Sequence, residues 1–441
     1  MHSTPIPTKS EHKFLGLIFD SKLSFIPHIK YLKVKCQKAL NILKVLSHRS
    51  WGSDRLCLLR IYGSVIRSRL DYGSIVYGSA RASALRMLDP IHHHGLRLAT
   101  GAFRTSPIPS LYAESNEWSL ERRRFALGFM YSLRIRSGPF HPSREAVETM
   151  RYKRNFENKP TVIQPFSMRN ASTADSIGLS STLPVTPIPQ TVAPWDYNLI
   201  SCDFSLTKYS KKDTPPECMR QEFFELHDRY AGHSSYYTDG TKTDTFVGCA
   251  MVGPSVRCVQ RISCTATILT AELCGLRLAI DHIVKTKRLQ SVVFTDSLSS
   301  LRALSSLKTS KTPIIMEVQN KISNASRRNI KIILCWVPSH VGIPGNEEPD
   351  LAASSAGEQE VDLHDIPYKD YHKLLKHCIR RKWQQEWDEE VNNKLHSVKP
   401  LLSEWESARH RERFYEVVLC RLRIGHTHPW PPPAQGRGPR V

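Results

Sequence analysis

Two acidic residues follow predicted strands, at positions where a sheet can present a side chain to a ligand. Asp239 comes after Tyr236-Tyr237-Thr238 and precedes Gly240, so we expect it to end a strand at a turn. Asp296 ends the run 292–295 (VVFT), which is apolar enough for a central strand buried on both faces. Because open α/β sheets bind ligands at the carboxyl ends of their strands, Asp296 lies where a functional acid is expected.

Two further acids are predicted to lie on helices. Glu272 shares one helical face with a set of apolar residues, Leu276, Ala279, Ile280 and Ile283. A carboxylate on such a buried stripe is unfavourable unless positive charge meets it. Asp350 falls in the first turn of a helix that Asn346 can cap, after the loop 338–345. Each of the four acids alone also fits a turn former, a cap or a solvated side chain.

The four acids together favour a metal centre. Carboxylates that converge on one sheet edge repel one another, and divalent cations usually relieve that repulsion. Oxygen-only ligands favour a hard ion, so we expect two Mg²⁺ ions, with Mn²⁺ as the alternative, rather than zinc. The triplet His92-His93-His94 is a poorer metal site, because consecutive side chains on a helix point in different directions.

Composition narrows the class of protein. The 441 residues exceed what one core usually organises, so we expect two or three domains. With 62 Lys+Arg against 41 Asp+Glu, the net charge of +21 favours a polyanionic partner, nucleic acid first and an anionic membrane surface second. The 11 cysteines contain no CxxC pair, which is typical of reduced thiols in an intracellular protein, nuclear or cytoplasmic. We find no secretory signal and no apolar run of transmembrane length.

Hydrophobic periodicity divides the chain into five parts. Residues 1–135 are predicted to be mostly α-helical, and 136–230 form a linker whose prolines cluster at 181–195. Short strands alternate with helices from 231 to 358, a helical segment covers 366–428, and a disordered tail covers 429–441.

Four motifs now identify a family resemblance: YYTDGTKT at 236–243, TAEL at 270–273, FTDS at 294–297 and WVPSHVGIPGNEEPD at 336–350. They resemble the type 1 ribonuclease H family in order, spacing and flanking residues. The resemblance implies an α/β fold, a five-stranded mixed sheet with flanking helices. It implies endonucleolytic cleavage of the RNA strand of RNA–DNA hybrids, without a small-molecule cofactor.

The same resemblance assigns roles to residues. It implies that the metal ligands are Asp239, Glu272, Asp296 and Asp350. His340 would be a proton shuttle or an aid to product release in a flexible loop, and Glu347 an acid near the metals. In a two-metal hydrolysis, Asp239 would bridge both ions. Contacts to the 2′-hydroxyl would select RNA, and weaker candidates for them are Gly240, Asn320 and Asn324.

The flanking segments carry a second resemblance. The stretches 14–25 (FLGLIFDSKLSF), 69–80 and 95–114 resemble the region after the polymerase palm in polyproteins of non-LTR retrotransposons of the I and jockey type. The stretch 419–428 resembles the segment that follows the ribonuclease H domain of these polyproteins. The paired-aspartate motif of the polymerase is absent, so no polymerase activity is expected. The match stops at His428 without a Cys/His knuckle. We therefore expect a truncated copy of such an element or a gene fragment.

The same acidic residues also allow other interpretations of the chain. A DEDD exonuclease would place its first Asp and its Glu in one short motif, and a DDE transposase would end its set with Glu. In a third alternative the chain is an inactive remnant that binds nucleic acid. This alternative draws on Pro349, which stands where the family more often has a small residue and lacks the amide that Asn346 would cap. Without this cap, Asp350 would be displaced from the metal site, and activity would fall. The sequence leaves the oligomeric state open.

Overall fold

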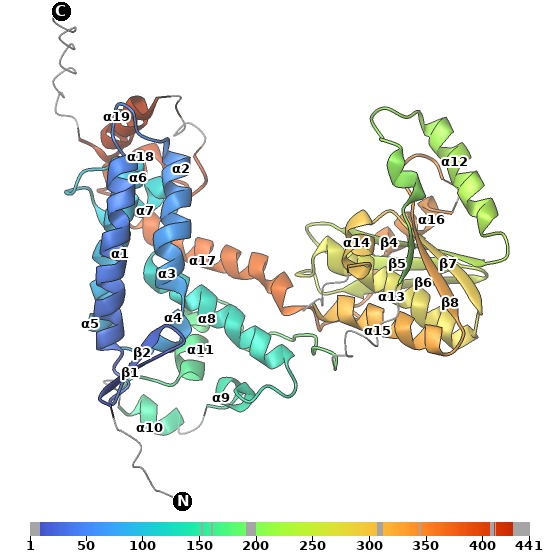
Figure 1. The fold of residues 1–441 in the computed structure, drawn as a ribbon, viewed down its shortest axis with the longest axis horizontal. Helices are drawn as coiled ribbons and strands as arrows, with labels where there is room; N and C mark the ends of the chain where they lie inside the picture. Colours follow the sequence, from blue (N-terminus) through green and yellow to red (C-terminus); the bar gives the residue numbers. More distant parts are fainter. Residues whose placement is uncertain are drawn as a thin grey trace, which may run out of the picture. The chain divides into compact units, whose positions relative to one another are not determined.

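The computed structural model describes residues 9–150, 153–159, 162–190, 200–306, 312–343, 345–405, 410 and 412–426. Internal contacts divide the chain into two units (Figure 1). The helical unit comprises Met1–Tyr131, Thr149–Ser181 and Lys376–Val441, and the sheet unit comprises Ser132–Glu148 and Thr182–Leu375. The tail expected at 429–441 lies outside the described residues.

The sheet unit is built on a mixed sheet with the strand order β3-β8-β7-β4-β5-β6. In chain order the strands are β3 (Ser201–Asp203), β4 (Ser234–Lys242), β5 (Val247–Gly253), β6 (Val256–Ile262), β7 (Gln290–Thr295) and β8 (Lys331–Trp336). β4, β5 and β6 are antiparallel neighbours, whereas β4, β7, β8 and β3 run parallel. The sheet thus contains the five strands of the predicted mixed sheet, with β3 added beside β8.

Helices cover both faces of this sheet. They are α12 (Pro216–Arg229), α13 (Ile268–Thr286), α14 (Leu298–Leu304), α15 (Pro313–Arg327) and α16 (Glu347–Ser354), with the 3-10 turns η4 (Ser205–Lys208), η5 (Ser355–Glu358) and η6 (Tyr368–Asp370). Cys249 of β5 meets Cys274 of α13, whereas the next residue, Ala250, packs with Ala352 and Ala353 of α16. Successive strand residues point to opposite faces, so α13 and α16 lie on opposite sides of the sheet.

The range 136–230 differs from the predicted linker. It contains α9 (Arg144–Glu148), α10 (Lys153–Glu157), α11 (Phe166–Ser176), β3 and α12. The apolar residues of α12, at positions 219, 223 and 226, are buried in one cluster with Phe294 and Ile333 of the sheet. Their i, i+4, i+7 spacing is helical, but charged residues and prolines surround this short pattern. Residues 191–199 of the expected linker lie outside the described part of the chain.

The helical unit agrees with the predicted α-helical character of the N-terminal region. Its elements are the hairpin β1 (Glu11–Phe14) and β2 (Leu17–Asp20), α1 (Ile26–Leu46), α2 (Arg55–Ile61), the π-helix η1 (Tyr62–Arg67), α3 (Ser68–Asp71), α4 (Ser74–Tyr77), α5 (Ala82–Leu85), η2 (Arg86–Leu88), α6 (Asp89–Thr100), α7 (Ile108–Ser115), α10, α11, α18 (Lys394–Val398) and α19 (Arg413–Ile424). Two helices, α8 (Leu120–Ser137) and α17 (Tyr371–Asp388), belong partly to each unit.

The C-terminal segment completes the core of the helical unit. Trp383, Trp387 and Cys420 are buried in one cluster with Ala113 of α7. The buried carboxylate of Glu114 lies 3.5 Å from the guanidinium group of Arg55 and 3.5 Å from that of Arg423. Arg55 precedes Glu114 in the sequence, and Arg423 comes from the C-terminal segment. Segments more than 250 residues apart therefore share this core. No helix within the described ranges is both long and apolar enough to cross a membrane.

Candidate active site

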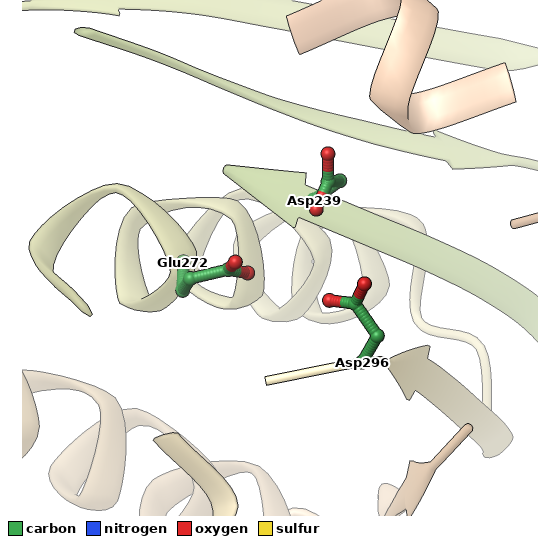
Figure 2. Close-up of side chains that lie close together, drawn as sticks. All are labelled: Asp239, Glu272 and Asp296. Carbon is green, nitrogen blue, oxygen red and sulfur yellow. The ribbon is translucent and has the colours of Figure 1, made fainter. Parts of the chain in front are cut away.

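Three carboxylates converge at one edge of the sheet unit. Asp239 comes from β4, Glu272 from α13, and Asp296 directly follows β7. Their side chains point toward one another (Figure 2), and one oxygen of each lies within 4.8 Å of the others. The fold thus brings together three of the four predicted acids from elements that are distant in sequence.

Strand register explains how the two aspartates become neighbours. β4 and β7 are parallel, and Thr238 pairs with Thr295, so the residue after each of them extends from the same edge. Gly240 sets the approach of α13 to this edge, because a Cβ atom there would lie only 2.7 Å from the backbone nitrogen of Glu272. A residue without a side chain therefore lets β4 contact the helix at the position of the third acid.

Asp350 and His340 lie at the same site but outside the three-carboxylate cluster. Asp350 is in the first turn of α16, and its side chain is 45% exposed. His340 is 75% exposed, and its Nδ1 lies 4.0 Å from an Asp350 carboxylate oxygen. Its backbone has a φ of 52°, in the left-handed region that non-glycine residues seldom adopt. The imidazole thus stands at the solvent side of the acids.

A cavity of about 240 Å³ joins these groups, lined by Asp239, Gly240, Glu272, Asp296, Ser339, His340, Asn346, Glu347 and Asp350. It includes the predicted acids, His340, Gly240 and Glu347. The candidates Asn320 and Asn324 lie on α15 and are not among the lining residues. The Asn324 side-chain oxygen accepts a hydrogen bond of 3.4 Å from Arg327. The two asparagines remain predictions from the sequence.

Burial and mutual repulsion set the electrostatics of the cluster. Burial, followed by the charges of Asp296 and Asp350, raises the pKa of Asp239 to about 7. Burial, followed by the charge of Asp239, raises the pKa of Glu272 to about 9. Burial also raises the pKa of Asp296, although the nearby charge of His340 opposes the shift. Without a cation, the site therefore retains protons at neutral pH.

Comparison with known proteins identifies the domain that carries this cluster. The sequence model of the family described as RNase H matches residues 232–358. Residues 232–358 are an RNase H domain. The limits expected from the motifs, 231–358, differ from this match by one residue.

A retrotransposon protein and several solved RNase H structures are similar to the chain. The retrovirus-related Pol polyprotein from type-1 retrotransposable element R1 of Bradysia coprophila is 30% identical over 77 residues, which cover 18% of this chain and 8% of that polyprotein. The chain thus matches only a small part of this homologue.

Two of the similar solved structures are an RNase H1 from Halobacterium salinarum and the N-terminal RNase H domain of a Mycobacterium tuberculosis protein. The first is 18% identical, covers 29% of this chain and 98% of that chain, and has a TM-score of 0.24. The second is 22% identical. Its match covers 28% of this chain and 94% of that chain, and it also has a TM-score of 0.24.

The residues of the RNase H domain fit a hard divalent cation. Glu272 Oε2 is buried and has no hydrogen-bond partner among the described residues, so this acceptor is left for a ligand. The three clustered acids offer oxygen atoms only, which suits Mg²⁺ or Mn²⁺ better than zinc. RNase H domains generally depend on divalent metal ions, and the cluster supplies suitable ligands.

A capping hydrogen bond is missing at the start of α16, beside the site of this RNase H domain. Asn346 is the N-cap of α16, but its side chain makes no capping hydrogen bond. Its Oδ1 atom is buried without a partner among the described residues. Position N3 of the helix, whose amide a cap usually binds, is Pro349 and has no N–H. The structure agrees with the sequence prediction of a lost cap, while Asp350 still lines the cavity.

Lys211 is a residue near the site that sequence reasoning missed. Its Nζ donates a hydrogen bond of 3.4 Å to the Ser339 hydroxyl, and its charge lowers the pKa of Asp296 against the larger effect of burial. Arg220 of α12 lies beside the same loop, since a Cβ on Gly342 would be 2.8 Å from its guanidinium. Both cations precede the RNase H domain in sequence, in a range where no motif or periodicity indicated a role.

Proposed function

We propose that the RNase H domain hydrolyses the RNA strand of RNA–DNA hybrids as an endonuclease, using two divalent ions, and that the chain derives from a retrotransposon polyprotein. The observation that carries this proposal is the convergence of Asp239, Glu272 and Asp296 within 4.8 Å, with one Glu272 oxygen left without a partner. The RNase H match and the similarity to the R1 polyprotein support the substrate class and the origin.

The carboxylates divide the binding of the ions between them. Asp239, Glu272 and Asp296 would hold one Mg²⁺ or Mn²⁺, and Asp239 with Asp350 would hold the other. When bound, such ions activate the attacking water and stabilise the charge of the pentacovalent transition state and of the leaving 3′ oxygen. Glu272 is 8% exposed, and the lower dielectric of a buried position would strengthen the interaction of its carboxylate with a cation.

His340 transfers a proton between the reacting atoms and solvent in this proposal. An imidazole can accept or donate a proton near neutral pH, and this one is exposed at the rim of the cavity. Its Nδ1 lies 4.0 Å from an Asp350 carboxylate oxygen, so the ring stands beside the proposed metal ligands. Gly240 also lines the cavity, and its backbone amide donates a hydrogen bond to the Asp239 carboxylate. We propose the backbone at this position as a contact to the 2′-hydroxyl that distinguishes RNA from DNA.

Cleavage of labelled nucleic acids by the full chain tests this proposal. We expect Mg²⁺-dependent cutting of the RNA strand in an RNA–DNA hybrid, with internal as well as terminal products. Duplex RNA and duplex DNA of the same sequence should remain intact. Cutting of all three duplexes, or removal of terminal nucleotides only, would contradict the assignment of an RNA–DNA hybrid endonuclease.

A second candidate function is binding of the hybrid without cleavage. The observation that favours it is the unpartnered Asn346 Oδ1 beside Pro349, because this missing cap lies at the start of the helix that carries Asp350. Hybrid binding that survives Asp239→Asn, together with no cleavage by the unmutated chain in Mg²⁺, would support this alternative.

A further inference from the structure

The segment that follows the matched RNase H range returns to the sheet unit. Leu363 forms a parallel bridge with Ile262, and its carbonyl accepts a hydrogen bond of 2.9 Å from the Ser263 amide. Ile366 is fully buried and forms a parallel bridge with Val185. Because these contacts lie beyond residue 358, the packed unit extends past the RNase H match.

Asp370, in this segment, binds the start of α13. Its side chain is buried, with the residue 6% exposed, and one oxygen, Oδ2, accepts three hydrogen bonds from the first turn of that helix. The donors are the Thr267 amide at 2.9 Å, the Thr267 hydroxyl at 3.3 Å and the Thr270 hydroxyl at 2.7 Å. A carboxylate here also meets the positive end of the helix dipole.

These contacts supply the reciprocal half of a capping box, which the sequence of α13 lacks. The N-cap Thr267 accepts a hydrogen bond from the Thr270 amide, as N-cap threonines commonly do. The reciprocal contact, to the N-cap amide, normally comes from a Glu or Gln at position N3. Position N3 is Thr270, whose side chain cannot fill that role, and the Asp370 carboxylate binds the Thr267 amide instead.

The same end of α13 is attached to the strand that carries Asp239. Lys242 of β4 donates hydrogen bonds to the carbonyls of Cys264 and Ala266, just before the helix. Gly240 lies against the Glu272 backbone, where an added Cβ would come within 2.7 Å of its nitrogen. Glu272 is only two residues from Thr270, so the anchored first turn fixes the origin of its side chain.

We propose that Asp370 is a positioning residue for Glu272, which sets the start of α13 and thereby holds the Glu272 carboxylate against Asp239 and Asp296. The consequence for cleavage rests on the proposed function, whereas the consequence for metal binding does not. Residues that orient metal ligands typically change metal affinity or activity by about 10–100-fold when they are removed.

The full chain with Asp370→Ala or Asp370→Asn tests this role. Mn²⁺ titration, with the free ion followed by electron paramagnetic resonance, should show about 10-fold weaker binding in Asp370→Ala. Asp370→Asn should retain most of the affinity, because its amide oxygen can still accept from Thr267 and Thr270. In hybrid cleavage, Asp370→Ala should lower kcat about 10–100-fold and leave KM unchanged.

Asp362→Ala is the matched control. Asp362 lies in the same segment and accepts a hydrogen bond of 3.0 Å from the Arg261 amide on β6, so its removal should leave Mn²⁺ affinity unchanged. Thr270→Val, which removes one donor to Asp370, should weaken Mn²⁺ binding, and its effect should not add to that of Asp370→Ala. Circular dichroism would confirm that each variant is folded.

The outcomes separate this inference from the proposed function. Unchanged Mn²⁺ affinity in folded Asp370→Ala would overturn the positioning role, even if the unmutated chain cleaves hybrids. Weaker Mn²⁺ binding in Asp370→Ala, with no cleavage by any form of the chain, would support the positioning role and contradict the cleavage proposal. An equal loss in Asp362→Ala would also overturn the inference, because the effect would then belong to the whole segment.

Discussion

The Glu272 carboxylate combines properties that an ordinary core residue does not have. It lies on the buried face of α13, and one of its oxygens has no hydrogen-bond partner among the described residues. An unpaired polar atom of this kind destabilises a fold by about 1–3 kcal/mol, unless a ligand satisfies it. This unfavourable term in the metal-free state is what cation binding would remove.

The raised pKa of Glu272 predicts a pH-dependent stability of the metal-free chain. Its folded-state pKa of about 9 lies above the unfolded value, so the folded state binds more protons between pH 5 and 9, and stability falls as pH rises through this window. Glu272→Gln should therefore stabilise the metal-free chain, and the gain should grow with pH by at most about 1.4 kcal/mol per unit.

Urea unfolding in EDTA at several pH values measures this gain. Glu348→Gln, the same change at an exposed position of α16, is the control and should show no such trend. Mg²⁺ should reverse the order of stability, because Glu272→Gln removes one charged ligand and the variant should bind the ion more weakly. If the free energy of unfolding differed between Glu272→Gln and the unmutated chain by the same amount at every pH, this result would contradict a buried, protonated Glu272 carboxyl.

Gly240→Ala should damage the site by steric contact alone. The new Cβ would lie 2.7 Å from the Glu272 nitrogen, so β4 and α13 must separate. Overpacking of this kind destabilises by about 1–3 kcal/mol, and a displacement near 1 Å can lower a rate about 10²-fold. Single-turnover cleavage and thermal unfolding measure both effects. Gly232→Ala, where no atom lies within 4 Å of the added Cβ, should be neutral, and equal effects of the two variants would refute the argument.

At the scale of elements, the sequence predicted best where a motif and a periodic pattern coincide. The buried run of β7 and the amphipathic α13 locate Asp296 and Glu272, and the parallel register of β4 and β7 then follows from the fold. β3 and α12 were missed because β3 has three residues and the apolar pattern of α12 is short and surrounded by charge. Asp370 was missed because its partners are about 100 residues away.

The first turn of α16 offers a test by restoration. Pro349→Ala supplies an N–H where the buried Asn346 Oδ1 has no partner among the described residues. A restored N-cap should stabilise the chain by about 0.5–2 kcal/mol, and a better-ordered helix start should raise the cleavage rate through Asp350. Urea unfolding measures the gain, which should vanish in an Asn346→Ala background. A gain that persists there would show that capping is not its cause.

At the scale of the whole molecule, the positive charge is concentrated in one unit. The helical unit contains 38 Lys+Arg and 18 Asp+Glu, whereas the sheet unit contains 24 and 23. The helical unit thus carries nearly all of the net charge of +21. Five lysines of α1, Lys30, Lys33, Lys35, Lys38 and Lys44, have no ion pair with a carboxylate within the described ranges. The total charge was evident from the sequence, but its division between units required the structure.

This charge distribution predicts which unit sets the salt dependence of hybrid binding. Each phosphate contact contributes about 0.9 to the slope of log affinity against log salt concentration, so replacing four lysines of α1 by Gln (Lys30, Lys33, Lys38 and Lys44) should reduce the slope by up to about 3.6. Fluorescence anisotropy in EDTA measures it. The control removes the same charge from the sheet unit, at Lys285, Lys287, Arg288 and Lys331. Equal slopes for both variants would contradict the prediction.

The most direct test of the central claim is the single-turnover rate of RNA cleavage by the full chain on an RNA–DNA hybrid in saturating Mg²⁺, with Asp239→Asn alongside. We predict cleavage by the unmutated chain and a loss of about 10²–10³-fold or more in the variant, with hybrid binding retained. Equal rates for the two proteins, or no cleavage by the folded, unmutated chain in Mg²⁺ or Mn²⁺, would contradict the assignment of a catalytic centre at Asp239, Glu272 and Asp296.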